Sequence, residues 1–388
     1  MDRRSFLGLG LTGAAGVTVG STAALGAKAF LDKRAEGAVG ETTVPFHGAQ
    51  QSGIASPLQS VGAIAAFTLR DDCDAARLQS LLRLWSADAA LLQAGKPAMA
   101  DAAPELATTP ASLTITFGLA HATFVRGGVA DKWPFAATAI PAFPIDALEP
   151  QWTGGDLFVQ VCANDALTVS HALRELVKDA RPFADIAWTQ HGTMPQVGVN
   201  PHATPRNLMG FKDGTGNPLP GTSTFEATVW NDGAKQSWFA NGSAVAIRRI
   251  RMNLDLWEKL QPQQMEAAFG RYVTTGAPLG GTHEFERADL VRRDANGEPV
   301  IPVDAHIRRA TLETDIYRRV FNYDDGPNDA GLLFIAYCAD IQQYLDIQQS
   351  LAEQDAINTW TTPVGSAMFV IPPGAPTPDS WVGETLFS

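Results

Sequence analysis

Asp156-Leu-Phe-Val-Gln-Val-Cys-Ala-Asn-Asp165 is an apolar run that ends in Cys-Ala and an acidic turn, and a helical pattern follows it over 166–178. The stretch Leu332-Leu-Phe-Ile-Ala-Tyr-Cys-Ala-Asp340 has the same order, with an amphipathic pattern over 341–356 behind it. Short apolar runs that end in turn residues predict strands, and apolar residues spaced three or four apart predict helices. The echo between the two stretches indicates two halves of similar build.

Further elements extend each half. In the first, 65–69 and 113–119 have strand patterns and 73–92 has helical spacing; in the second, 243–252 is predicted as a strand and 265–274 as a helix. Strand, helix, strand, strand, helix is the order of an antiparallel sheet with helices packed on it. We therefore predict an α+β fold of two ferredoxin-like domains, 30–200 and 201–388, joined somewhere between 180 and 207.

Composition excludes several classes of protein. The 388 residues are 45% apolar and 18% charged, and they include 35 glycines and 25 prolines, which argues against both a coiled coil and wholesale disorder. A formal net charge of −12 makes a nucleic-acid partner unfavourable, because phosphate backbones would be repelled. Cys73, Cys162 and Cys338 form neither a CxxC pair nor the CxxCH signature of covalent haem attachment.

The first 29 residues read as an export signal. Arg3-Arg4 precede a stretch from Ser5 to Ala27 that has no charged residue, and Ala27-Lys28-Ala29 resembles a cleavage site. We expect a twin-arginine signal peptide over 1–29, recognised by the twin-arginine export machinery, and a periplasmic or extracellular protein; an uncleaved anchor is the alternative. Cleavage would remove three basic residues and one acidic residue, so the formal charge would change from −12 to −14. This export route is typical of proteins that fold around a cofactor first.

A glycine-rich loop, Gly210-Phe-Lys-Asp-Gly-Thr-Gly-Asn-Pro218, is the densest turn signal in the chain. A phosphate-binding loop is one interpretation, but the GxxxxGK[ST] motif is absent and Asp213 would repel phosphate. A calcium loop built on Asp213, Thr215 and Asn217 is another, although it lacks the closing glutamate of an EF-hand. A tight turn at the surface explains the spacing equally well.

Histidine offers the second candidate. None of the seven histidines forms HExxH or an HxH pair, so the sequence does not support a multi-histidine zinc site. His306 is followed by Arg308 and Arg309. One imidazole beside arginines suits a metal porphyrin, whose iron takes an axial nitrogen and whose propionates need cations; a solvated basic patch is the alternative.

These residues together resemble the dye-decolourising peroxidase family. Gly210-Phe-Lys-Asp-Gly214 matches the GxxDG motif of that family, and Asn217-Pro218 also fits. Six further stretches agree in order along the mature chain: Phe46–Ile54, Gly276–Gly280, His306–Ala310, Ile316–Arg319, Gly331–Tyr337, and Val364–Ala367 with Pro372–Gly374. With the export signal, the chain is most similar to the exported branch that contains the deferrochelatase/peroxidase enzymes.

The resemblance implies a fold of the dimeric α+β barrel type and one b-type haem per chain. His306 would be the proximal iron ligand, Asp213 the distal acid and base, and Arg318, with Arg319 as the alternative, the distal cation. Glu313, or failing that Asp315, would accept the other imidazole N–H. The remaining cofactor contacts would come from Gly214, Thr215, Gly216, Asn217, Arg309 and Phe334.

The function implied is reduction of hydrogen peroxide with phenolic, dye-like or other one-electron donors. An iron-acquisition role of the deferrochelatase kind, through oxidation of ferrous iron or release of iron from haem, would use the same site. A haem carrier without turnover would need neither Asp213 nor Arg318. A calcium-dependent solute-binding protein is the reading without haem. A homo-oligomer is compatible with the sequence.

Overall fold

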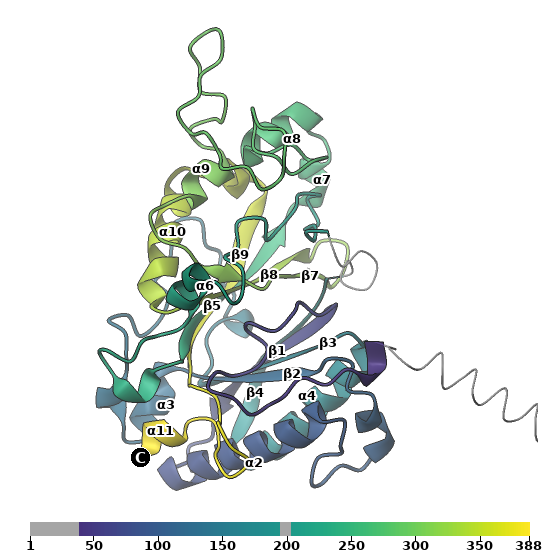
Figure 1. The fold of residues 1–388 in the computed structure, drawn as a ribbon, viewed down its shortest axis with the longest axis vertical. Helices are drawn as coiled ribbons and strands as arrows, with labels where there is room; N and C mark the ends of the chain where they lie inside the picture. The colour runs from purple at the N-terminus through teal and green to yellow at the C-terminus, as the bar shows by residue number, and fades with distance from the viewer. Residues whose placement is uncertain (1–38, 195–202) are drawn as a thin grey trace, which may run out of the picture.

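A computed structural model describes residues 39–194 and 203–388 of the chain (Figure 1). The signal peptide predicted over 1–29 and the domain boundary predicted at 200/201 lie outside the described residues. Within the described ranges, no helix is both long enough and apolar enough to cross a membrane.

The first half has a βαββαβ order. Its elements are β1 (Val61–Leu69), α2 (Ala75–Gln93), β2 (Thr114–Leu119), β3 (Leu157–Ala163), α4 (Ala166–Ala180) and β4 (Ala184–Thr193). The strands pair antiparallel in the order β2-β3-β1-β4, and α2 packs beside α4 against the sheet. Shorter elements are η1 (Val39–Glu41), η2 (Pro104–Thr108), α3 (His121–Arg126), η3 (Ala130–Lys132) and η4 (Pro150–Trp152).

The second half repeats this order with a divided second strand. Its elements are α6 (Ser223–Val229), η5 (Ser237–Phe239), β5 (Ser243–Met252), α7 (Leu254–Trp257), α8 (Pro262–Phe269), α9 (His306–Ala310), β6 (Tyr317–Arg318), β7 (Phe321–Asp324), β8 (Ala330–Cys338), α10 (Ile341–Gln354), η6 (Ala356–Thr359), β9 (Thr361–Ile371) and α11 (Glu384–Phe387). β9, β5 and β8 pair antiparallel, and β6 and β7 both pair with β8. The helix expected over 265–274 is instead α8, which ends at Gly270 in a left-handed conformation.

The two halves close into one barrel. Leu119 of β2 pairs with Val370 of β9, and Thr193 of β4 pairs with Asn322 of β7, so each outer strand of one sheet meets an outer strand of the other. In Figure 1, α2 and α4 lie toward the lower end of the molecule, whereas α8 and α9 lie toward the upper end, with α10 below α9 at mid-height. The predicted α+β fold of the family is confirmed.

The strands are apolar on both faces because each face lies against a core. Val159 and Val161 of β3 join the core under α2 and α4, whereas Phe158 and Cys162 lie in the second core, among side chains of β5, β8 and β9. Side chains alternate between the two faces of a strand, so a strand buried on both sides reads as a continuous apolar run. The acidic turns of the echo also have a structural role. Asp165 caps the N-terminus of α4, and Asp340 caps that of α10.

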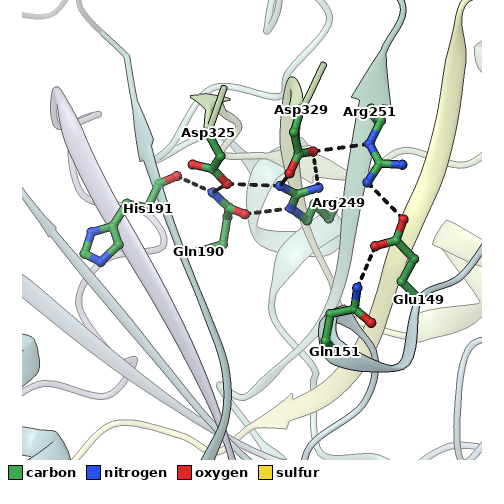
Figure 2. A network of polar contacts seen from close by, with 8 residues as sticks. All are labelled: Glu149, Gln151, Gln190, His191, Arg249, Arg251, Asp325 and Asp329. Carbon is green, nitrogen blue, oxygen red and sulfur yellow. Dashed lines mark hydrogen bonds and ion pairs between the residues drawn. The ribbon is translucent and has the colours of Figure 1, made fainter. Parts of the chain in front are cut away.

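A polar network connects the halves at one point (Figure 2). The guanidinium of Arg249 on β5 donates to Gln190 of β4 at 2.7 Å and to Asp329 at 2.8 Å. Arg251 donates to Asp329 and, at 2.9 Å, to Glu149 of the first half. Arg249 is almost fully buried, so these partners supply the charge compensation that a buried cation requires.

Candidate functional site

An apolar cavity in the second half brings several of the predicted site residues together. Two adjoining hollows, of about 110 and 220 Å³, share His306, Asp213, Arg318 and Phe334 in their linings. Apolar side chains complete the shared lining, among them Phe269, Ile316, Ile347 and Leu351. A mainly apolar cavity with a few convergent polar groups is typical of a cofactor site.

His306 begins the short helix α9 and is held by a buried carboxylate. Its Nδ1 lies 2.6 Å from Oδ2 of Asp355, a side chain only 1% exposed. Asp355 is fixed in turn, because its Oδ1 accepts the backbone N–H of Ile357 at the start of η6. With the proton on Nδ1, the imidazole donates to Asp355 and presents the lone pair of Nε2, as a metal-binding histidine does.

The structure places neither Glu313 nor Asp315 beside His306. Glu313 is exposed, and the backbone carbonyl of Asp315 accepts from Gln343. The expectation that Glu313 accepts the imidazole N–H is therefore wrong, and Asp355 takes that position. Asp355 is the C-cap residue of α10, and the packing of α10 against α9 brings it to His306 although 49 residues separate the two.

Asp213 and Arg318 form an ion pair in the cavity. Nη1 of Arg318 donates to Oδ1 of Asp213 at 3.2 Å, and both side chains are mostly buried. Asn217 fixes the arginine from the other side, since its Oδ1 accepts from the Arg318 backbone N–H at 3.1 Å and its Nδ2 donates to the Arg318 carbonyl at 2.7 Å. These two bonds fix the position of the glycine-rich loop relative to β6.

Arg319 points into a different part of the molecule. It is fully buried, and its guanidinium donates to the carbonyls of Ile54 and Ser56 and to the Gln59 side chain in the first half. Successive residues of an extended chain face opposite ways, so only one of the two arginines can enter the cavity. That residue is Arg318.

Some of the other residues of the glycine-rich loop line the cavity, and others form the turn that shapes the loop. Thr215 and Gly216 line the cavity. Gly214 has a φ of +113°, a conformation that side chains rarely adopt, and its carbonyl accepts the N–H of Asn217 in a tight turn. Phe334 of β8 lines the cavity beside Tyr344 of α10.

Arg309 lies outside the cavity, and a different arginine lines it. Arg309 donates to Gln354 of α10 and is not part of the cavity lining. Arg271, two residues after Phe269, does line the cavity, and its Nη1 donates to the carbonyls of Gly276 and Glu284. Burial lowers the pKa of Arg271, and the nearby positive charge of Arg318 lowers it further.

Arg271 pairs with no carboxylate among the described residues. A half-buried guanidinium that donates only to carbonyls, with the positive charge of Arg318 nearby, suits an anionic ligand group. A free imidazole nitrogen, an apolar lining and an unpaired cation together match the iron, the ring and the propionates of a haem. The residues present therefore fit this cofactor.

A second group of candidate metal ligands lies in the first half. Asp101, His171 and Glu175 have side-chain atoms within 4.8 Å of one another. His171 Nε2 lies 2.9 Å from Asp101, and Lys178 pairs with Glu175. The imidazole of His171 and the ammonium of Lys178 therefore already lie against the two carboxylates of this group.

Comparison with family models covers most of the described chain. The model "Dyp-type peroxidase, N-terminal" matches residues 51–193, and the model "Dyp-type peroxidase, C-terminal" matches residues 204–376. The two matches leave a short gap that contains the segment 195–202.

Individual relatives agree with the family models. The chain is 37% identical to a dye-decolorizing peroxidase of Thermobifida fusca over 84% of this chain and 81% of that protein. It is 32% identical to a deferrochelatase of Shigella flexneri over 88% of this chain and 87% of the relative.

Solved structures are similar along nearly their whole length. A DyP-type peroxidase from Cellulomonas bogoriensis superposes with a TM-score of 0.87 at 39% identity, covering 90% of this chain and 99% of that one. DtpA from Streptomyces lividans, solved as an oxyferrous complex, gives a TM-score of 0.85 at 38% identity, with the same coverage.

Proposed function

Because the chain belongs to the Dyp-type peroxidase family, whose members are haem enzymes, we propose that it reduces hydrogen peroxide at a haem held by His306, with Asp213 and Arg318 acting on the peroxide. The observation that carries this proposal is the 3.2 Å pair between Asp213 and Arg318 in a cavity that His306 also lines. A haem carrier would need no acid–base group paired with a fixed cation.

His306 and Asp355 would hold the cofactor. When bound, haem supplies the iron at which peroxide is reduced and the electrons that donors later replace. Nε2 of His306 is the nitrogen available to the metal, and the hydrogen bond from Nδ1 to Asp355 fixes the orientation of the ring and increases its basicity. Arg271, which lines the same cavity, would pair with a propionate.

Asp213 and Arg318 would divide the work on the peroxide. Oδ1 of Asp213 accepts from Arg318, so Oδ2 is the oxygen that can take a proton from one peroxide oxygen and return it to the other, which leaves as water. The guanidinium of Arg318 stabilises the negative charge that develops as the O–O bond breaks. Oδ1 of Asn217 also accepts from Nε of Arg318 at 3.4 Å, and this contact restrains the guanidinium.

Two electrons and two further protons from donors complete the conversion of one peroxide into two waters. Phenolic or dye-like donors that give one electron at a time suit this chemistry. The net charge of −12, or −14 without the first 29 residues, favours cationic or neutral donors over anionic ones at long range.

The relatives named deferrochelatase support a second candidate, an iron-acquisition role at the same cavity. It differs from the first in its product. A peroxidase consumes peroxide and donor and leaves its haem intact, whereas a deferrochelatase releases iron and metal-free porphyrin. Measuring porphyrin fluorescence during turnover distinguishes the two.

Arg318→Leu tests the proposal. Removal of one preorganised cation should slow the reaction of the haem-loaded protein with peroxide by about 10²–10³-fold, and haem content should stay at the parent level. Arg293→Leu, at an exposed site, is the matched control and should react like the parent. Stopped-flow absorbance after mixing with peroxide measures both variants. Reaction of Arg318→Leu at the parent rate would overturn the assignment.

We also propose export by the twin-arginine route to the periplasm or the outside of the cell. The support is Arg3-Arg4 ahead of an uncharged stretch, together with a large cofactor that would be inserted before export.

A further inference from the structure

Glu284 holds the Asp213 loop without touching Asp213. One oxygen of its carboxylate accepts from the Thr215 hydroxyl at 3.0 Å and from the Thr204 hydroxyl, and the other accepts from the ammonium of Lys212. Lys212 directly precedes Asp213, and Thr215 follows it by two residues. One carboxylate therefore clamps the loop on both sides of the proposed proton-transfer residue.

The Lys212–Glu284 pair of this clamp is mostly buried. The side chain of Glu284 is 12% exposed and that of Lys212 is 17% exposed, so the pair interacts in a medium of low polarity. Burial alone would raise the pKa of Glu284, yet the hydrogen bonds from Lys212, Thr204 and Thr215 hold it below the ordinary value. Glu284 is therefore ionised at neutral pH.

Gly276 makes room for this pair. Its φ is +76°, and a Cβ at this position would lie 2.7 Å from Cδ of Lys212 and 3.3 Å from Cγ of Glu284. The main chain of Glu284 is also fixed, since its carbonyl accepts from Arg271 at 3.1 Å. Lys212 and Glu284 therefore pack closely against the backbone at Gly276, whereas the partners of an ordinary surface ion pair are free to move in solvent.

The backbone of the loop has its own attachment next to the clamp. The N–H of Asp213 donates to the Pro205 carbonyl at 2.8 Å, and Arg206 donates to the carbonyls of Gly210 and Val273. These bonds hold the main chain where the loop begins. The side chains of Lys212 and Thr215, on either side of Asp213, are then oriented by Glu284.

We propose that Glu284 is a positioning residue for proton transfer: it keeps the Lys212 ammonium away from Asp213, so that the Asp213 carboxylate pairs with Arg318 alone and remains basic enough to accept a proton. Without Glu284, Lys212 loses its counter-ion one residue from Asp213. An additional cation near a carboxylate favours its ionised form and makes it a weaker base. This inference rests on the proposed function of Asp213 and Arg318.

Cyanide binding to the ferric haem-loaded protein tests the inference without turnover. Hydrogen cyanide must lose a proton before it binds iron, so its association rate reports the proton acceptor in the cavity. Glu284→Gln should lower this rate by about 10- to 100-fold, because a displaced or less basic acceptor is a poor one. It should also move the acidic limb of the rate–pH profile to lower pH. Glu286→Gln is the matched control, since Glu286 accepts from Thr282 and His283 on the same segment and contacts no part of the loop.

A double-mutant cycle distinguishes failure of the role proposed for Glu284 from failure of the function proposed for Asp213. If Glu284 acts through Asp213, Glu284→Gln should have no further effect in an Asp213→Asn background. Equal losses in both backgrounds, or a parent-like rate for Glu284→Gln beside a slow Asp213→Asn, would overturn the role of Glu284. A parent-like rate for Asp213→Asn would instead overturn the proposed function. Thr215→Val removes only the 3.0 Å bond, so it should give a smaller change in the same direction even if Glu284→Gln fails to fold.

Discussion

Replacement of Asp355 by asparagine should raise the Fe³⁺/Fe²⁺ midpoint potential of the bound haem. The carboxylate lies 2.6 Å from Nδ1 of His306 and is almost completely buried, so its charge is little screened. A hydrogen bond to a charged group contributes about 1.5–3 kcal/mol, and a bond to a neutral acceptor about 0.5–1.5. Asparagine keeps the shape and loses the charge, so the difference is about 1–1.5 kcal/mol.

That free energy is roughly 40–60 mV for a one-electron couple, because a tenfold change in equilibrium constant is about 59 mV. The shift is upward, since a more basic imidazole stabilises ferric iron over ferrous iron. Spectroelectrochemical titration measures it. Glu313→Gln is the control, because that exposed residue makes no contact with the ring. Parallel thermal unfolding monitors the cap that Asp355 gives to η6. A potential for Asp355→Asn within about 10 mV of the parent, with haem retained, would refute the reasoning.

Two further predictions concern stability and export. Burial and the neighbouring Asp88 and Glu175 raise the pKa of Asp179 to about 7 from an ordinary value of 3.8. A group with a raised folded pKa contributes stability that is complete below about pH 4 and lost as pH rises through about 7. Asp179→Asn should therefore increase the unfolding temperature more at pH 8 than at pH 5, and the two increases should differ by roughly 2 °C or more. Asp324→Asn, at an exposed site, is the control. An equal increase at both pH values would contradict this expectation. For export, lysine at both Arg3 and Arg4 should leave the protein in the cytoplasm, as fractionation and immunoblotting would show, whereas continued export would exclude the twin-arginine route.

Local sequence patterns predicted the strands well because most of them are buried on both faces. The Leu157 and Leu332 runs gave β3 and β8, and the acidic turns after them became helix caps at Asp165 and Asp340. Local patterns did not show closure of the barrel, which was expected only from the family resemblance, since β2 meets β9 and β4 meets β7 through single residue pairs far apart along the chain. Such contacts depend on the twist and packing of whole sheets.

The site shows the same division. Four separate motifs of the family resemblance gave Asp213, Arg318, His306 and Phe334, and the structure brings all four to one cavity. The partner of His306 was assigned wrongly because Asp355, at the end of α10, reaches it only through the packing of α10 against α9. Arg309 was expected from its place beside His306, but a five-residue helix turns it toward Gln354, whereas Arg271 faces the cavity. The sequence around His306 predicted neither its carboxylate partner nor the cavity-lining arginine, because tertiary packing determines both.

A crystal structure of the protein with haem bound would test the proposed site most directly. We expect iron bonded to Nε2 of His306, with Nδ1 of the same ring hydrogen-bonded to Asp355. We also expect Asp213 and Arg318 on the opposite face of the porphyrin, with Arg271 beside a propionate. Iron ligated by any other side chain, or Asp213 and His306 on the same face of the ring, would contradict these expectations.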